Sequence, residues 1–257
     1  MDLGIKGQAF IVTGASSGLG KAVAERLLEE GAEVLVIARR KELLEQLETR
    51  FPGQLEAMTS DVRDPDLDKK LAGYLSKKQV KGVFVNAGGP PAKSIAETMI
   101  SDWDEAYRLL IRWKIMLVSS LLPYFEERSY GRILFSESSS VKQPVENLVL
   151  SNSFRMAVVG FSKTICQEYA RKGITSNVIG PGHHDTEAVK RLFVKKSEQA
   201  GISVDQARIQ SVSQIPVRKM GEAFDFATLA AWLLSPLAGF VTGQVFFIEG
   251  GTIKSSL

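Results

Sequence analysis

The chain has 257 residues, a net charge of +3, an apolar fraction of 44% and a charged fraction of 24%, which fit one large globular α/β domain. Because the charge is small and no run of five or six like charges occurs, the sequence predicts no nucleic-acid partner. A single cysteine, Cys166, excludes an intrachain disulfide and a cysteine-based metal site, and we expect it to be a small buried side chain.

No segment has the features of a membrane span or of a targeting signal. The most apolar long segment, residues 115–125, is interrupted and too short to cross a bilayer. The first residues lead directly into an apolar run at 9–13, without a charged region followed by an apolar one. We therefore expect a cytoplasmic protein without a membrane partner.

Short apolar runs alternate with longer helical patterns along the whole chain. Near-continuous apolar runs are typical of parallel strands that are covered on both faces. The runs lie at residues 9–13, 33–38, 55–60, 82–87, 132–136, 176–180 and 244–250. Helical patterns lie between them at 21–31, 41–50, 102–127 and 151–172. The alternation predicts a single-domain Rossmann fold over 1–257, a doubly wound parallel sheet of about seven strands with helices on both faces.

One region interrupts this rhythm. Residues 184–215 are polar and helical, and no strand pattern occurs inside them. A long insertion after the sixth strand begins at a strand's carboxyl end, where ligands bind in such sheets. We interpret it as a lid over a substrate, with a surface helical hairpin without a moving part as the alternative.

The segment TGASSGLG, residues 13–20, lies between the first apolar run and the first helical pattern. Gly14, Gly18 and Gly20 have a spacing related to the dinucleotide fingerprint. Glycine permits a sharp turn and lets a pyrophosphate approach a helix N-terminus, where free N–H groups favour anions. The strand before the loop and the helix after it favour a phosphate-binding loop over a purely structural turn.

The end of the second apolar run indicates which nucleotide binds. A carboxylate at this point would bind the adenosine ribose 2′-hydroxyl of NAD(H). The chain has Arg39 and Arg40 there instead, and guanidinium groups can bind a 2′-phosphate. The sequence therefore predicts NADP(H) in preference to NAD(H); the alternative is that both arginines begin a helix in solvent.

Together with the glycine loop, six further motifs carry a family resemblance over essentially the whole chain. They are SDV at 60–62, NAG at 86–88, GRI at 131–133, AVVGFSK at 157–163, GITSNVIGPG at 173–182 and VTGQVFFIEGG at 241–251. In these motifs the chain resembles the short-chain dehydrogenases/reductases. The members most similar in character are β-ketoacyl carrier-protein reductases and sugar dehydrogenases.

The resemblance implies a cofactor site and an assembly. Asp61 and Val62 would flank the adenine, and Pro181 and Gly182 would border the nicotinamide, whose carboxamide Thr186 would bind. The family is usually a homotetramer, so we expect a homo-oligomer, a dimer or a tetramer, with the last motif in an interface. The full set of expected cofactor-binding residues is Gly14, Ser16, Ser17, Gly18, Leu19, Gly20, Arg39, Arg40, Asp61, Val62, Asn86, Ala87, Gly88, Arg155, Pro181, Gly182 and Thr186.

The catalytic positions of the family are where the sequence departs from it. The family uses Asn, Ser, Tyr and Lys; these positions fall here on Leu110, Ser138, Ser151 and Arg155. A serine hydroxyl is a far weaker acid than a phenol and is shorter by a ring. An arginine can bind ribose hydroxyls, but its pKa above about 12 prevents it from relaying protons. The family mechanism therefore cannot operate unchanged, although Ser138 and Ser151 could still hold a substrate oxygen.

Four other residues are candidates for the missing proton donor. His183 and His184 follow the expected nicotinamide loop, and the pKa of histidine suits acid–base chemistry; both could equally be loop residues that point elsewhere. Glu137 and Lys142 flank the retained serine, but Glu137 could instead pair with a base and Lys142 could lie in solvent.

Three functions follow as hypotheses. The first is an NADP(H)-dependent oxidoreductase of a carbonyl or alcohol, 3-oxoacyl or sugar/polyol-like, with an atypical proton donor. The second is a non-catalytic NADP(H)-binding sensor or partner subunit. The third, a structural subunit without a cofactor site, is disfavoured by the intact loop motifs. Trp113, Phe154, Val145 and Phe193 could line an apolar substrate pocket, although helix packing explains them equally well.

Overall fold

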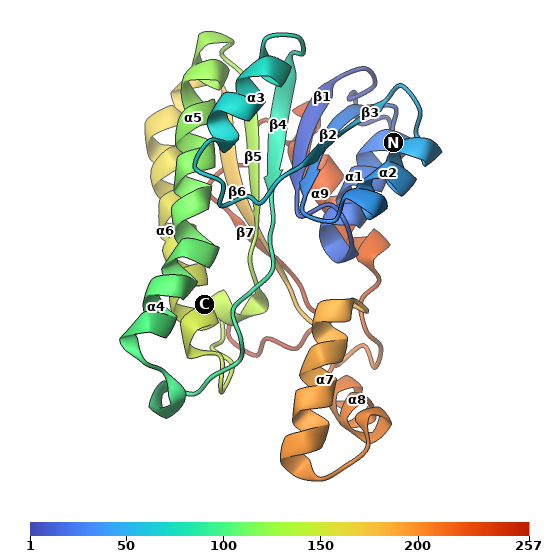
Figure 1. Ribbon diagram of the computed structural model, residues 1–257, viewed down its shortest axis with the longest axis vertical. Helices are drawn as coiled ribbons and strands as arrows, with labels where there is room; N and C mark the ends of the chain where they lie inside the picture. Colours follow the sequence, from blue (N-terminus) through green and yellow to red (C-terminus); the bar gives the residue numbers. More distant parts are fainter. Residues whose placement is uncertain (257) are drawn as a thin grey trace.

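The computed structural model describes residues 1–256 and is built around one parallel sheet of seven strands (Figure 1). The strands lie side by side in the order β3-β2-β1-β4-β5-β6-β7, and each neighbouring pair is parallel. Their bounds are β1 Ala9–Thr13, β2 Glu33–Ala38, β3 Leu55–Thr59, β4 Val80–Val85, β5 Gly131–Ser136, β6 Ile174–Pro181 and β7 Val245–Ile248. The predicted Rossmann fold is confirmed.

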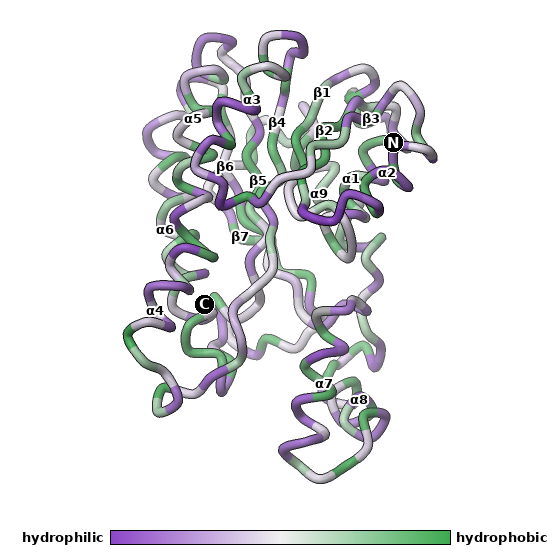
Figure 2. The backbone as a smooth tube through the Cα atoms, in the orientation of Figure 1, coloured by the Kyte–Doolittle hydropathy of each residue, from purple (hydrophilic) through white to green (hydrophobic). Residues whose placement is uncertain are grey.

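Helices cover both faces of the sheet because successive residues of each strand point to opposite faces. Phe10 and Val12 of β1 belong to one buried cluster, which includes side chains of α1 (Gly18–Glu29), α2 (Lys41–Arg50) and α9 (Ala223–Leu234). Ala9 and Ile11 belong to a second cluster with α3 (Leu67–Leu75), α5 (Trp113–Glu127) and α6 (Val149–Tyr169). Figure 2 shows the hydrophobic strands enclosed between these two layers of helices.

The long helix predicted at 102–127 is divided into three segments. It consists of α4 (Ile100–Tyr107), a π-helical segment η2 (Arg108–Arg112) and α5. Such π segments widen a helix by one residue and occur often at functional sites. Here the π segment contains Leu110, which is 1% exposed and packs in the second core cluster.

The insertion forms two helices, α7 (Glu187–Ala200) and α8 (Val204–Ser213), beyond the carboxyl ends of the strands (Figure 1). Phe193 and Ala207 pack with Met220 in a small cluster of their own. Short 3₁₀ turns complete the chain: η1 (Ile95–Glu97), η3 (Ser139–Val141), η4 (Ala170–Lys172) and η5 (Pro236–Ala238).

Cys166 is free and buried in α6, as predicted. Over residues 1–256, none of the helices is both long enough and apolar enough to cross a bilayer.

The strand order reverses direction between β1 and β4. The chain proceeds from β1 outward to β2 and β3 and then returns to place β4 on the other side of β1. At such a switch point the connections leave in opposite directions and open a crevice at the carboxyl ends of the strands, where ligands bind. The glycine loop follows the carboxyl end of β1 and the NAG motif follows that of β4, so both lie at this switch point.

Candidate functional site

The glycine loop lies against the end of β4, and this contact requires two of its glycines. A side-chain carbon on Gly20 would lie 2.3 Å from the carbonyl oxygen of Gly14, and one on Gly14 would lie 2.6 Å from that of Asn86. Thr13 accepts a hydrogen bond from the Asn86 amide at 2.8 Å and lies 2.8 Å from the Asn86 carbonyl oxygen, to which it can donate. The loop is thus held with the first turn of α1 open to a pyrophosphate.

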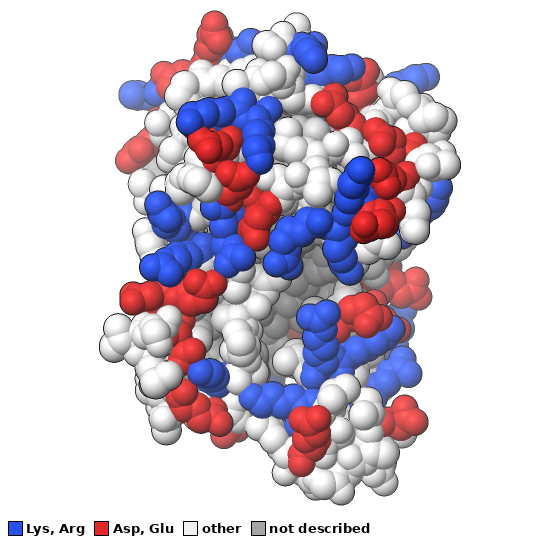
Figure 3. Space-filling model, in the orientation of Figure 1, with Lys and Arg blue, Asp and Glu red and all other residues white. Residues whose placement is uncertain are grey.

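Arg40 lies over this loop. Its Nε and Nη2 donate to the Ser16 hydroxyl at 3.1 and 2.9 Å, and Nη2 also donates to the Ser17 hydroxyl at 2.5 Å. Both Arg39 and Arg40 are exposed. The guanidinium therefore lies at the edge of the glycine loop, and its planar donors suit a phosphate or carboxylate group. Figure 3 shows that basic side chains border the hollow in this face of the molecule.

The loop after β3 carries an ion pair that the sequence analysis missed. Arg63 donates from Nε and Nη2 to the two carboxylate oxygens of Asp61 at 3.1 and 3.0 Å. This hydrogen bonding lowers the pKa of Asp61, and the nearby charge of Arg39 lowers it further. The signal was present as an aspartate and an arginine two residues apart, a spacing that brings both side chains together in a turn.

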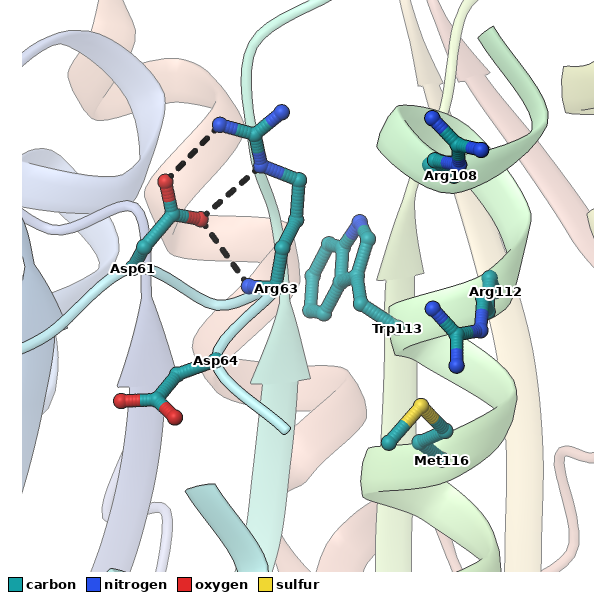
Figure 4. Close-up of a pocket in the computed structure, with 7 residues that line it drawn as sticks. All are labelled: Asp61, Arg63, Asp64, Arg108, Arg112, Trp113 and Met116. Atoms are coloured by element: carbon teal, nitrogen blue, oxygen red, sulfur yellow. Dashed lines mark hydrogen bonds and ion pairs between the residues drawn. The ribbon is translucent and has the colours of Figure 1, made fainter. Parts of the chain in front are cut away.

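A cavity of about 420 Å³ lies beside this pair (Figure 4). It is an open cavity between the loop after β3 on one side and η2 and α5 on the other. Its lining residues are Asp61, Arg63, Asp64, Arg108, Arg112, Trp113 and Met116. Ser138, Ser151 and Arg155 are not among them, so the cavity adjoins the expected adenine position rather than the expected reaction centre. Trp113, interpreted as a possible substrate-pocket residue, lines this cavity and is 2% exposed.

The remaining expected cofactor residues are distributed around the same crevice. Thr186 begins α7, and its methyl carbon would lie 3.5 Å from a side-chain carbon on Gly18, so the base of α7 approaches the phosphate loop. The Gly182 amide donates to the Ile248 carbonyl at 2.8 Å, just after β6 ends at Pro181. Leu19 packs against the first core cluster, whereas Val62 and Ala87 pack against the second, and Gly88 is exposed.

Three of the four positions predicted to correspond to the family's catalytic residues, Ser138, Ser151 and Arg155, lie near the end of β5, whereas Leu110 packs in the second core cluster. Ser138 begins η3, and its hydroxyl accepts a hydrogen bond from the Ser140 amide at 3.1 Å. Ser151 and Arg155 are one turn apart on α6, and Arg155 Nε donates to the Ser151 hydroxyl at 3.0 Å. Arg155 Nη1 donates to both the carbonyl oxygen and the carboxylate Oε2 of Glu137 at 3.1 Å.

A second cation, from α5, contacts Glu137. Lys114, on α5, donates to Glu137 Oε1, and both side chains are removed from solvent, with exposed fractions of 2% and 0%. Burial lowers the pKa of Lys114; the Glu137 carboxylate opposes this effect and the Arg155 charge adds to it. Lys114 was not predicted from the sequence, although it occupies the buried face of α5 with Leu117, Val118 and Leu121. A lysine on the apolar stripe of a helix was the available signal.

The two histidines contact other parts of the chain. The His183 ring stacks on Phe193 of α7 at a centroid distance of 6.3 Å, and the His184 ring meets Phe226 of α9 edge-on at 5.8 Å. His184 is 2% exposed, and its Nδ1 lies 3.3 Å from the Gly182 carbonyl oxygen. Burial lowers the pKa of both imidazoles, so both are neutral at pH 7.

A smaller cavity of about 120 Å³ lies next to the histidines. Its lining residues are His183, His184, Ile215, Val217, Lys219, Met220, Gly221, Asp225, Ile248, Glu249 and Gly250. Within residues 1–256, no group of three or more His, Cys, Asp and Glu side chains is arranged to hold a metal ion.

The strand order, the glycine loop at the switch point and the residues that surround it define a dinucleotide-binding oxidoreductase fold. Residues 14–252 match the family described as enoyl-(acyl carrier protein) reductase, and the chain belongs to this family of short-chain dehydrogenases/reductases. Its members are NAD(P)-dependent oxidoreductases of carbonyl and alcohol substrates, and this chain has the scaffold for that chemistry.

Individual relatives are similar over almost their whole length. A 3-oxoacyl-(acyl-carrier-protein) reductase, FabG of Vibrio cholerae, is 26% identical, with 97% of this chain and 98% of the relative covered. The structure of L-sorbose reductase from Gluconobacter frateurii with NADPH and L-sorbose has a TM-score of 0.90 at 26% identity, covering 99% and 100% of the two chains. A variant of actinorhodin polyketide ketoreductase with NADPH has a TM-score of 0.91 at 28% identity, covering 97% and 98%.

Proposed function

We propose that the protein is an NADP(H)-dependent oxidoreductase that acts on a carbonyl or alcohol substrate of the 3-oxoacyl or sugar/polyol type, with an atypical arrangement for holding the substrate oxygen. The observation that carries the cofactor choice is the guanidinium of Arg40, seated on Ser16 and Ser17 at the edge of the phosphate loop. The relatives with 26–28% identity that were solved with NADPH support the same choice.

The shape and charge of the crevice fit this cofactor. The close approach of Gly14, Gly20 and Asn86 leaves room for backbone and phosphate but not for side chains. In this proposal the glycine loop holds the pyrophosphate, Arg39 and Arg40 hold the 2′-phosphate, and the nicotinamide lies between Ser138 and the loop from Pro181 to Thr186. When bound, the cofactor would supply or accept a hydride, and the side chains of the protein would hold and polarise the substrate oxygen.

The protein's own contribution is to hold and polarise the substrate oxygen. The hydroxyls of Ser138 and Ser151 can donate hydrogen bonds to it, and the Arg155 guanidinium places a permanent positive charge beside it. The absent phenol should cost about 10²–10⁴ in rate, the usual contribution of a general acid. Since His183 and His184 are neutral at pH 7, either could act only as a neutral donor to the substrate or to a water.

We propose further that α7 and α8 cover the substrate as a lid. Lys195 on α7 donates to the Ala92 carbonyl in the loop after β4, so the insertion is fastened to the opposite side of the crevice. His183 and Phe193 connect α7 to the loop after β6 through their stacked rings.

We also propose that the protein is a homo-oligomer. Large apolar side chains are exposed on two neighbouring helices, Ile115 and Met116 on α5 and Met156 on α6, and Phe240 is fully exposed before β7. Exposed apolar patches of this kind are typical of association surfaces.

The alternative function is an NADP(H)-binding protein without turnover, a sensor or partner subunit. The replacement of the family's Tyr and Lys by Ser151 and Arg155 favours it. Turnover separates the two functions: a protein that binds NADPH tightly and reduces no member of a panel of 3-oxoacyl and sugar carbonyls is the non-catalytic homologue.

A fluorescence titration with NADPH and with NADH tests the cofactor assignment. We expect NADPH to bind about tenfold or more tightly than NADH, because only NADPH offers the 2′-phosphate to Arg40. Arg40→Ala should reduce this preference, because only Arg39 then remains to hold the 2′-phosphate, and it should not weaken NADH binding. The matched control is Lys41→Ala, which removes a neighbouring exposed cation paired with Glu45 and should leave both affinities unchanged. Equal affinity for the two nucleotides in the unmodified protein would contradict the assignment.

A further inference from the structure

Three charged side chains from three different elements meet behind the reaction centre. Lys114 comes from α5, Glu137 from the residue after β5 and Arg155 from α6. Lys114 donates to one carboxylate oxygen of Glu137, and Arg155 donates to the other at 3.1 Å. We refer to these three residues as the buried ion cluster.

The buried ion cluster contains two cations and one anion. The exposed fractions of the side chains are 2% for Lys114, 0% for Glu137 and 11% for Arg155. Both oxygens of the carboxylate are already used, and water cannot surround the lysine. Burying a charge away from water costs free energy unless an opposite charge is paired with it. The excess positive charge can therefore be offset only on the side where Arg155 reaches the surface.

Arg155 reaches the surface next to the expected substrate position. Nε is engaged by Ser151 and Nη1 by Glu137. A side-chain carbon on Gly89 would lie 3.2 Å from Nη2, and Gly89 is exposed in the loop that follows the NAG motif. The open edge of the guanidinium therefore faces the crevice at the carboxyl end of β4.

We propose that the buried ion cluster makes Arg155 a binding site for an anionic oxygen of the substrate, with Lys114 and Glu137 as positioning residues. Glu137 fixes the plane of the guanidinium, and Lys114 neutralises Glu137, so that the charge of Arg155 remains available to a ligand. A guanidinium edge suits a carboxylate or an oxyanion because it offers donors in a fixed plane. This inference rests on the proposed function, since the oxygen belongs to the molecule bound beside the cofactor.

The charge of the buried ion cluster should depend on pH. The charged groups that face Lys114 are Glu137 from the end of β5 and Arg155 from α6, and burial lowers the pKa of the lysine. As pH rises through this pKa, the net charge of the cluster falls from one positive charge to zero. Affinity for an anion should therefore decrease as pH increases.

The test uses the full chain saturated with NADPH and titrated with formate, the simplest carboxylate, followed by the nicotinamide fluorescence. We expect saturable binding in the unmodified protein and binding about tenfold or more weaker in Lys114→Met, in which Glu137 cancels the charge of Arg155. The double variant Lys114→Met/Glu137→Gln restores one net positive charge and should regain most of the affinity, without the pH dependence. Lys172→Met is the control and should behave as the unmodified protein, because Lys172 is a half-buried cation in η4, beyond the C-terminal end of α6, and pairs with Glu126.

This rescue separates charge balance from a merely structural role, which would make the double variant at least as poor as the single one. Unchanged formate affinity in Lys114→Met, or no recovery in the double variant, would overturn the inference. Failure of NADPH itself to bind would instead refute the proposed function. A matched ligand pair identifies the source of the oxygen: 2-oxobutyrate binding more tightly than 2-butanone indicates a carboxylate carried by the substrate. Equal binding of these two ligands, with turnover lowered in Lys114→Met, indicates the oxyanion formed at the carbonyl.

Discussion

Removing Glu137 and removing Lys114 should have opposite consequences for stability, although the two side chains share one ion pair. Glu137→Gln leaves Lys114 and Arg155 buried beside each other without an anion, and removing one partner of a buried pair typically costs about 3–5 kcal/mol. Lys114→Met removes one of two cations and leaves Glu137 paired with Arg155. We therefore expect Lys114→Met to be close to neutral or stabilising, by up to about 1–2 kcal/mol.

The stability lost in Glu137→Gln has an upper limit, which is the free energy needed to remove the proton from Lys114. Lys114 can escape the repulsion by losing its proton, and neutralising a lysine of ordinary pKa 10.5 at pH 7 costs about 5 kcal/mol at 1.36 kcal/mol per pKa unit. The expected loss of about 3–5 kcal/mol is a large share of the roughly 5–15 kcal/mol by which a domain is stable.

The sign of the pH dependence follows from the direction of the pKa shift. Because burial lowers the pKa of Lys114 in the folded protein, the unfolded chain binds more protons between that pKa and 10.5. The free energy of unfolding therefore rises with pH across this window. The destabilisation by the buried, protonated Lys114 is fully present below its pKa in the folded protein. Glu137→Gln lowers the folded pKa further and widens the window, whereas Lys114→Met abolishes this contribution.

Urea denaturation followed by circular dichroism from pH 6 to pH 10 measures all three proteins. Glu126→Gln, which breaks the half-exposed pair with Lys172, is the control and should change the free energy of unfolding by at most about 1 kcal/mol. The reasoning fails if Glu137→Gln is as stable as the unmodified protein at pH 7, or if Lys114→Met is equally destabilised.

Two other predictions concern the loop and the proton donor. Gly20→Ala would place a carbon 2.3 Å from the Gly14 carbonyl, so we expect NADPH affinity to fall by about 100-fold, with a loss of about 1–3 kcal/mol in stability; unchanged NADPH titration would contradict the tight loop. His183→Ala and His184→Ala test the histidine hypothesis: we expect one of them to abolish turnover while NADPH still binds. Full activity in both variants would exclude an imidazole donor. Because His184 packs against Phe226, its replacement also affects stability, so the turnover of His184→Ala must be expressed per folded molecule and not per total protein.

The scaffold was predictable from the sequence because its signals are local. Apolar runs of four to eight residues placed all seven strands, and the runs at 9–13 and 33–38 coincide with β1 and β2. Strand–helix alternation then leaves few topologies, and the glycine spacing predicts a phosphate-binding loop. The sequence also predicts departures from the family at Leu110, Ser151 and Arg155, because a motif fixes its positions along the chain.

The partners of those residues depended on tertiary structure. The helical pattern at 102–127 did not show the π segment at Arg108–Arg112, which is a local change in hydrogen bonding without a sequence period of its own. Glu137 was considered a donor or half of an ion pair, but its partners, Lys114 and Arg155, are 23 and 18 residues away. Only the packing of α5 and α6 against the end of β5 excludes water from the carboxylate. Local sequence therefore determined which groups are present, while their charge and accessibility were decided by the fold, because desolvation is a property of the assembled core.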